Sequence, residues 1–164
     1  MTHIQHGKWV QYTPEALPAN APAATMFARR EGDNVDWYGY VNPHLDTATG
    51  KPKETPDARR FAADSVKFAA IMTTLTDGRE AYVVGAAVYD ENMIWPANKI
   101  VVEIPGYSGG DPQEELRNKI YDPATETFSD LPPPPQMRES EAKILSALDD
   151  IARRLAALEN KGGA

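Results

Sequence analysis

The chain has 164 residues, a formal net charge of −7 and no cysteine. This length allows one globular domain with an appendage, and the acidic balance argues against binding to nucleic-acid phosphates or anionic membranes. The lack of cysteine excludes disulfides and thiolate chemistry, and no stretch approaches the ~20 apolar residues of a membrane span. Because no secretion signal is visible at its start, we expect a soluble protein that is cytoplasmic or released by lysis.

Residues 1–24 are polar and carry prolines at positions 14, 18 and 22. Proline fixes φ and pushes the preceding residue toward extended geometry, so helix is disfavoured here. The pattern predicts an extended N-terminal arm with one short strand at residues 8–12. His3 and His6 have the spacing of two metal ligands on one helical face, but no third ligand is near, and we expect a disordered pair.

Residues 25–130 have the pattern of a globular domain rich in strands. Residues 25–30 and 35–41 flank a four-residue connection of turn formers, which predicts a hairpin. Farther on, Thr55 fits an N-cap and Pro56 the first position of a short helix.

The strongest strand pattern follows. Residues 66–75 and 80–89 are apolar and rich in β-branched side chains, and Asp77-Gly78 between them predicts a hairpin. Three more elements are predicted: a strand at residues 100–104, one or two helical turns at residues 113–120, and a hairpin of residues 119–121 with 127–128. We therefore expect a mainly β body, a small sandwich or barrel with minor helix.

Four consecutive prolines at positions 132–135 end this body. They predict a linker over residues 131–136 in the polyproline II conformation, which rises about 3.1 Å per residue. Residues 137–161 then carry a heptad pattern. Its apolar members follow one another at intervals of 4, 3, 4 and 3 residues: Ile144, Leu148, Ile151, Leu155 and Leu158.

This spacing is typical of a parallel coiled coil with Leu148 and Leu155 at position a. Arg154 and Glu159 then occupy positions g and e, the spacing of a salt bridge between parallel chains. Leucine at a with isoleucine at d favours a homotrimer, with a tetramer as the other choice. The alternative is a single amphipathic helix folded back onto its own body.

The sequence contains no Walker loop, dinucleotide glycine fingerprint or nucleophile elbow, and its carboxylates lie at turns and helix starts. We expect neither enzymatic activity nor a metal or cofactor. Exposed tyrosine and tryptophan can stack on sugars or anchor a protein partner, although core packing explains such residues as well. The candidates for contact with a partner or a host-surface glycan are Trp37, Tyr38, Tyr40 and Trp95.

A short segment at the end of the body reads Tyr121-Asp122-Pro123-Ala124-Thr125-Glu126-Thr127-Phe128. With the proline run and the heptad tail, it resembles the C-terminal arrangement of small bacteriophage proteins from tail-fibre, baseplate and tail-assembly gene neighbourhoods. The motif usually has glycine where this chain has Glu126, so we expect a turn without a positive-φ residue there. Asp122 would cap this hairpin turn and Pro123 would preset its φ, and residues 46–50 carry a similar turn that keeps its glycine.

The resemblance implies a phage structural role with no catalytic residues to carry over. We expect a homotrimeric fibre or adaptor, made in the bacterial host cytoplasm and attached to the capsid, neck or tail of the virion beside other virion proteins. Two alternatives stay open. One is a tail or tail-fibre assembly chaperone absent from the mature virion, and the other is a carbohydrate-binding module that recognises the host.

Overall fold

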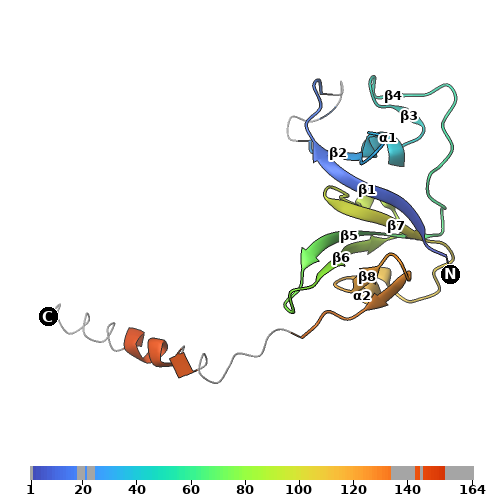
Figure 1. Cartoon of the computed structure of the whole chain (residues 1–164). Helices are drawn as coiled ribbons and strands as arrows, with labels where there is room; N and C mark the ends of the chain where they lie inside the picture. The colour runs from blue at the N-terminus through green and yellow to red at the C-terminus, as the bar shows by residue number, and fades with distance from the viewer. Residues whose placement is uncertain (1, 18–20, 22–24, 134–142, 145, 154–164) are drawn as a thin grey trace. The chain divides into compact units, whose positions relative to one another are not determined.

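A computed structural model describes residues 2–17, 21, 25–133, 143–144 and 146–153 (Figure 1). The chain divides into two compact units, Met1–Pro132 and Pro133–Ala164, and each is described by itself. The first unit is mainly β, as predicted.

One seven-stranded antiparallel sheet forms the centre of the first unit, with the strand order β2-β1-β7-β5-β6-β8-β9. Its strands are β1 (Ile4–Tyr12), β2 (Phe27–Arg30), β5 (Val66–Thr74), β6 (Glu80–Val88), β7 (Lys99–Ile104), β8 (Ile120–Asp122) and β9 (Thr127–Ser129). A small second sheet pairs β3 (Leu45–Asp46) with β4 (Lys51–Pro52). The helical elements of this unit are α1 (Trp37–Val41), the 3-10 helix η1 (Glu91–Met93) and α2 (Pro112–Leu116).

The predicted hairpins after residue 66 are confirmed. In the β5–β6 turn, the backbone N–H of Leu75 donates to the carbonyl of Arg79 over 2.7 Å, and Gly78 has a φ of 85°. Glycine adopts this conformation without steric cost, which is why Asp-Gly is a strong turn signal. β8 and β9 form the predicted small hairpin at the end of the unit.

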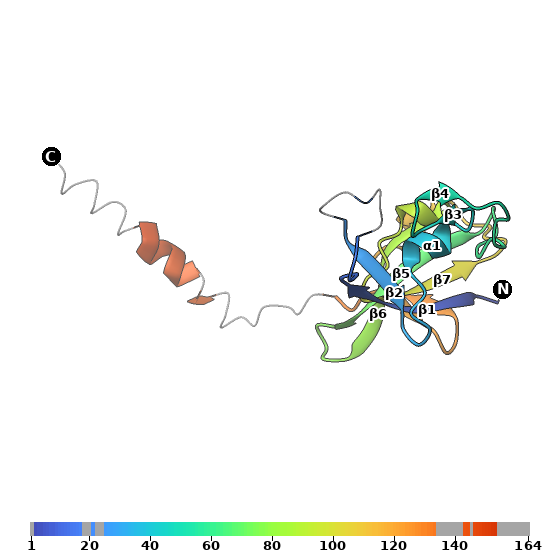
Figure 2. The same ribbon diagram turned by 90° about the horizontal axis from the view of Figure 1, so that it is seen from above.

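Apolar side chains cover both faces of this one sheet, so the expected sandwich or barrel is replaced by a single open sheet. Ala69 and Val101 lie on the face that packs against α1, whereas Phe68 and Val102 lie on the face that packs against Leu116 of α2. Figures 1 and 2 place α1 beside the β3–β4 hairpin.

The sheet curls until the β8–β9 hairpin reaches the beginning of β1. The rings of Phe68 and Tyr121 lie 4.8 Å apart, although β5 and β8 are not neighbours in the sheet. Gln5 Nε2 donates to the carbonyl of Pro123 over 3.2 Å. Side-chain contacts therefore connect the β8–β9 hairpin to β1 and β5, whereas a closed barrel would connect its first and last strands by backbone hydrogen bonds.

The strand predicted at residues 8–12 is confirmed, and it begins earlier, at Ile4, as β1. These residues belong to the sheet, so they do not form a separate arm as predicted. β1 lies inside the sheet between β2 and β7, and Trp9 has no exposed surface. A register shift between Gln5 and Lys8 surrounds Gly7, whose φ is 87°. This bulge breaks the period-two alternation that identifies a strand in a sequence, because it turns His6 and Trp9 to the same face.

The second arm of the hairpin predicted at residues 25–41 is also wrong, because it folds as α1. Asp36 caps this helix, and its Oδ1 accepts two backbone N–H groups of the first turn over 2.9 and 3.3 Å. Trp37, Tyr40 and Val41 are its buried residues, at the i, i+3, i+4 spacing of one helical face.

No helix begins at Thr55 and Pro56, contrary to the prediction. Residues 53–65 are irregular and bury Phe61 against the sheet. The backbone N–H of Ala62 donates to a Glu103 carboxylate oxygen over 2.7 Å, and its carbonyl accepts from Lys67 Nζ over 2.8 Å. Side chains of two strands thus satisfy backbone groups that a helix would otherwise pair internally.

Asp46 and Asp122 begin two turns with the same hydrogen bonds. In each turn the Asp carboxylate accepts the backbone N–H two residues later over 2.9 Å and a Thr hydroxyl three residues later over 2.8 Å. Gly50 has a φ of 66° and Glu126 a φ of 56°. The prediction that Glu126 would avoid positive φ is therefore wrong, and both turns have a positive φ at this position although only one of them has glycine there.

The second unit is helical over residues 143–144 and 146–153. Ile144, Leu148 and Ile151 of the predicted seam are 60%, 56% and 53% exposed. The remaining seam residues Leu155 and Leu158 lie outside the described residues, as do the predicted charge pair Arg154 and Glu159. Residues 134–136 of the linker predicted at residues 131–136 lie outside them too. The coiled coil and its trimeric order stay predictions.

Candidate functional site

A pocket of about 390 Å³ opens between α1, β2, the β3–β4 turn and the segment that joins η1 to β7. Three of the four aromatic residues predicted as contacts line it, namely Trp37, Tyr38 and Trp95, whereas Tyr40 does not. The fold therefore brings together aromatic side chains from two segments that are distant in the sequence.

α1 gives its two neighbouring rings different roles. Successive side chains in a helix point about 100° apart, so Trp37 is 7% exposed while Tyr38 is 49% exposed. Trp37 packs edge-on against Trp9, with ring centroids 4.8 Å apart and planes at 83°. A Cβ at Gly39 would lie 3.0 Å from Thr47 Cγ2, so glycine allows the β3–β4 turn to approach the helix.

The pocket offers hydrogen-bonding groups but no unengaged charge. Among the described residues that line it, Asp36 is the only aspartate, glutamate, histidine, lysine or arginine. Its Oδ1 caps α1, and its Oδ2 accepts the hydroxyl of Tyr12 over 2.9 Å. Thr25, Thr47 and Asn92 supply neutral donors and acceptors.

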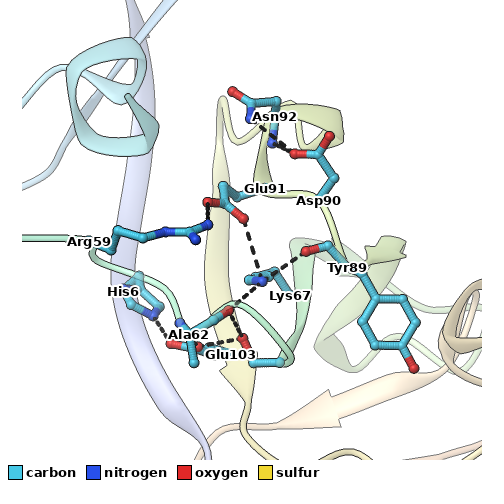
Figure 3. A network of polar contacts seen from close by, with 10 residues as sticks. His6, Arg59, Ala62, Lys67, Tyr89, Asp90, Glu91, Asn92 and Glu103 are labelled. Carbon is cyan, nitrogen blue, oxygen red and sulfur yellow. Dashed lines mark hydrogen bonds and ion pairs between the residues drawn. The ribbon is translucent and has the colours of Figure 1, made fainter. Parts of the chain in front are cut away.

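A second candidate is a buried polar network on the same face of the sheet (Figure 3). Lys67 has no exposed side-chain surface, and its Nζ donates to the carbonyls of Ala62 and Tyr89 over 2.8 Å each. The same Nζ lies 3.5 Å from the Glu91 carboxylate, which also lies 3.3 Å from Arg59. All three donor positions of the ammonium group therefore have a partner.

Glu103 and His6 form the other half of this network. Glu103 Oε1 accepts the hydroxyl of Ser65 over 2.5 Å, and its Oε2 lies 2.9 Å from His6 Nε2. His6 Nδ1 lies 2.7 Å from the Tyr40 hydroxyl, and that hydroxyl accepts from Arg30 over 3.3 Å. A neutral His6 whose Nε2–H donates to Glu103 and whose Nδ1 accepts from Tyr40 gives the Tyr40 hydroxyl proton a partner while its oxygen accepts from Arg30.

The ionisation of this group follows from its surroundings. Burial lowers the pKa of His6, although Glu103 opposes the shift. Burial works against the ionised form of Glu103, but hydrogen bonds from Ser65, Ala62 and His6 leave its pKa below the usual value. Burial also raises the pKa of Tyr40, so its hydroxyl is a poor nucleophile. The network binds residues 59–65 to the sheet, and its members are engaged with one another.

The expectation of a disordered histidine pair is wrong. His6 is 6% exposed within this network, and His3 stacks on Tyr121 with ring centroids 5.7 Å apart. Glu103 itself carried a usable signal, because a carboxylate inside an apolar strand requires a buried partner. Lys67, between Val66 and Phe68 in the sequence, carried the same signal.

The predicted hairpin-turn residues lie together at the end of the curled sheet. Tyr121 is buried and Phe128 is half-buried. Asp122 holds the turn, and the carbonyl of Pro123 accepts from Gln5. These residues connect the β8–β9 hairpin to β1, so their role in the structure is packing.

Across the described residues, no group of three His, Asp or Glu side chains is placed to hold a metal ion. No helix in that part of the chain has the length and apolar character needed to cross a membrane. Comparisons with protein-family models, curated proteins and solved structures find no match to this chain.

Proposed function

We propose that this chain is a non-enzymatic structural protein of a bacteriophage virion, a homotrimeric fibre or adaptor attached to the capsid, neck or tail. In this proposal the β-rich unit contacts other proteins of the particle or its host, and the C-terminal helix sets the number of copies. One observation carries the oligomeric part: Ile144, Leu148 and Ile151 are each more than half exposed on one helical stripe.

Association of several copies would remove this stripe from water. Full burial of one leucine or isoleucine side chain contributes about 1.5–3 kcal/mol. A helix this short is marginal alone in water, so burial against other copies also supports the helix itself. The intervals of 4 and 3 residues match knobs-into-holes packing between helices.

The non-enzymatic part rests on how the polar side chains are used. The carboxylate, imidazole and ammonium groups of the buried network bond to one another and to the backbone of residues 59–65. Asp36, the acid in the pocket, caps a helix and accepts a tyrosine hydroxyl. These hydrogen bonds stabilise the fold, and a structural or binding role does not require any of them to break.

Mass spectrometry of particles purified from a lysate of the phage that encodes this chain tests the proposal. The chain should be present in washed particles, at a copy number that is a multiple of three. Its presence in the lysate but absence from particles would overturn the virion role and support the assembly chaperone.

A further inference from the structure

We propose that the pocket between α1, β2, the β3–β4 turn and the η1–β7 segment binds one ring of a neutral sugar. This inference goes beyond the structural role, and it stands or falls independently of oligomerisation by the helix.

The walls of the pocket supply aromatic surface. Tyr38 is 49% exposed and Trp95 is half-buried, while Trp37 is buried and lies deeper. Tyrosine and tryptophan present a rigid apolar face together with a polar edge. The C–H groups of a sugar ring match such a face, and its hydroxyls match a polar rim.

Neutral hydrogen-bonding groups stand beside these rings. The hydroxyls of Thr25 and Thr47 make no hydrogen bond to any other described residue, and each can both donate and accept, as a sugar hydroxyl does. Asn92 uses its Nδ2 toward Asp90, and its side-chain carbonyl oxygen is left as an acceptor. An apolar partner side chain would cover these groups without replacing their bonds to water, which is costly.

Charge decides between neutral and anionic sugars. The described lining of the pocket contains no lysine or arginine, and Asp36 accepts hydrogen bonds from three donors of the protein. A carboxylated, sulfated or phosphorylated sugar would therefore find no positive side chain among these residues and would be repelled by the carboxylate of Asp36. The volume of about 390 Å³ lies at the lower end of the range of about 300–1,000 Å³ for small-molecule sites.

Titration of the full-length chain with neutral oligosaccharides tests the proposal. The probes are the hexaoses of glucose in α-1,4 and β-1,4 linkage, of mannose and of N-acetylglucosamine, with oligogalacturonate as the anionic contrast. Calorimetry should find a neutral probe that binds with a dissociation constant below about 1 mM. Tyr38→Ala and Trp95→Ala should each weaken that binding by about tenfold, and Thr47→Val should also weaken it.

Tyr89→Ala is the matched control, because Tyr89 is 48% exposed and does not line the pocket. This variant should bind like the unchanged chain, and thermal unfolding of each variant separates lost binding from lost folding. The proposal is overturned if no neutral probe binds, if the anionic probe binds more tightly, or if the Tyr38 and Trp95 variants bind like the control. If a peptide carrying tryptophan or leucine saturates the pocket and binds more tightly than every sugar tested, the proposal is also overturned, and the pocket is assigned to a protein partner.

Discussion

Replacing Lys67 with methionine tests whether the buried network holds the first unit together. Methionine is similar in length and leaves little empty space, so the substitution removes mainly the charge and its bonds. The carbonyls of Ala62 and Tyr89 would each lose a donor at 2.8 Å. Glu91 would keep only the more exposed Arg59 as its charged partner.

The expected loss is large for a single side chain. Breaking a buried ion pair by removing one partner costs about 3–5 kcal/mol, and each buried polar group left unpaired costs about 1–3 kcal/mol. Because Arg59 still neutralises Glu91, we expect the free energy of unfolding to fall by about 3–5 kcal/mol rather than by the full sum.

Urea unfolding of the full chain, followed by tryptophan fluorescence at one fixed protein concentration, measures this loss. Lys8→Met is the matched control, because Lys8 forms an ion pair with Glu31 at 3.4 Å but both side chains are at least half exposed. Such a surface pair contributes about 0–1 kcal/mol. The interpretation of the network is refuted if the two variants lose the same small amount.

Acidification should weaken the first unit in two steps. Burial lowers the pKa of His6 in the folded chain, and the nearby charges of Arg30 and Lys67 act in the same direction. In the unfolded chain His6 binds a proton near its ordinary pKa of 6.5. The unfolded state therefore binds the proton more readily, and stability should fall as the pH drops below about 6.5. Glu103, whose pKa is lowered overall despite its burial, should add a second loss below about pH 4.5. Urea midpoints that stay flat from about pH 7 to pH 5 would contradict the His6 step, and midpoints that stay flat from about pH 4.5 to pH 2.5 would contradict the Glu103 step. Glu126→Gly should lower the pKa of His3 further, since the Glu126 carboxylate raises that pKa against the effect of burial, and NMR titration of the His3 ring should detect the change. Stability should change by less than about 2 kcal/mol, because relief of the positive φ offsets the lost bond to the His3 N–H; an unmoved His3 titration would contradict the contact.

Local chemistry explains what could be predicted of the fold. Asp77-Gly78 between two apolar runs identifies the β5–β6 hairpin, because both strands and their turn lie in one short segment. The second half of β1 was predicted as a strand at residues 8–12, but its first half could not be recognised, since the bulge at Gly7 interrupts its alternation and its partner β7 lies far along the chain. α1 was mistaken for a strand because Val35, Trp37 and Val41 also fit a period of two.

The candidate site was predictable only in part. The aromatic residues were selected by their chemistry, but a strand assignment could not show that Tyr40 reaches the buried network, where its hydroxyl contacts His6, while Trp37 and Tyr38 line the pocket. The network of Lys67, Glu103 and His6 depends on contacts between distant segments. Charged residues within apolar strands were its one visible mark.

The oligomeric state of the full-length chain in solution tests the central claim most directly. Light scattering after gel filtration at micromolar concentration should give a mass three times the 18.0 kDa of one chain. Leu148→Asp with Ile151→Asp places charge on the exposed stripe and should give monomers. Ser146→Asp with Arg153→Asp, at position f of the heptads, should stay trimeric. A monomeric full-length chain, or a trimer that survives charges at Leu148 and Ile151, would contradict assembly through the C-terminal helix.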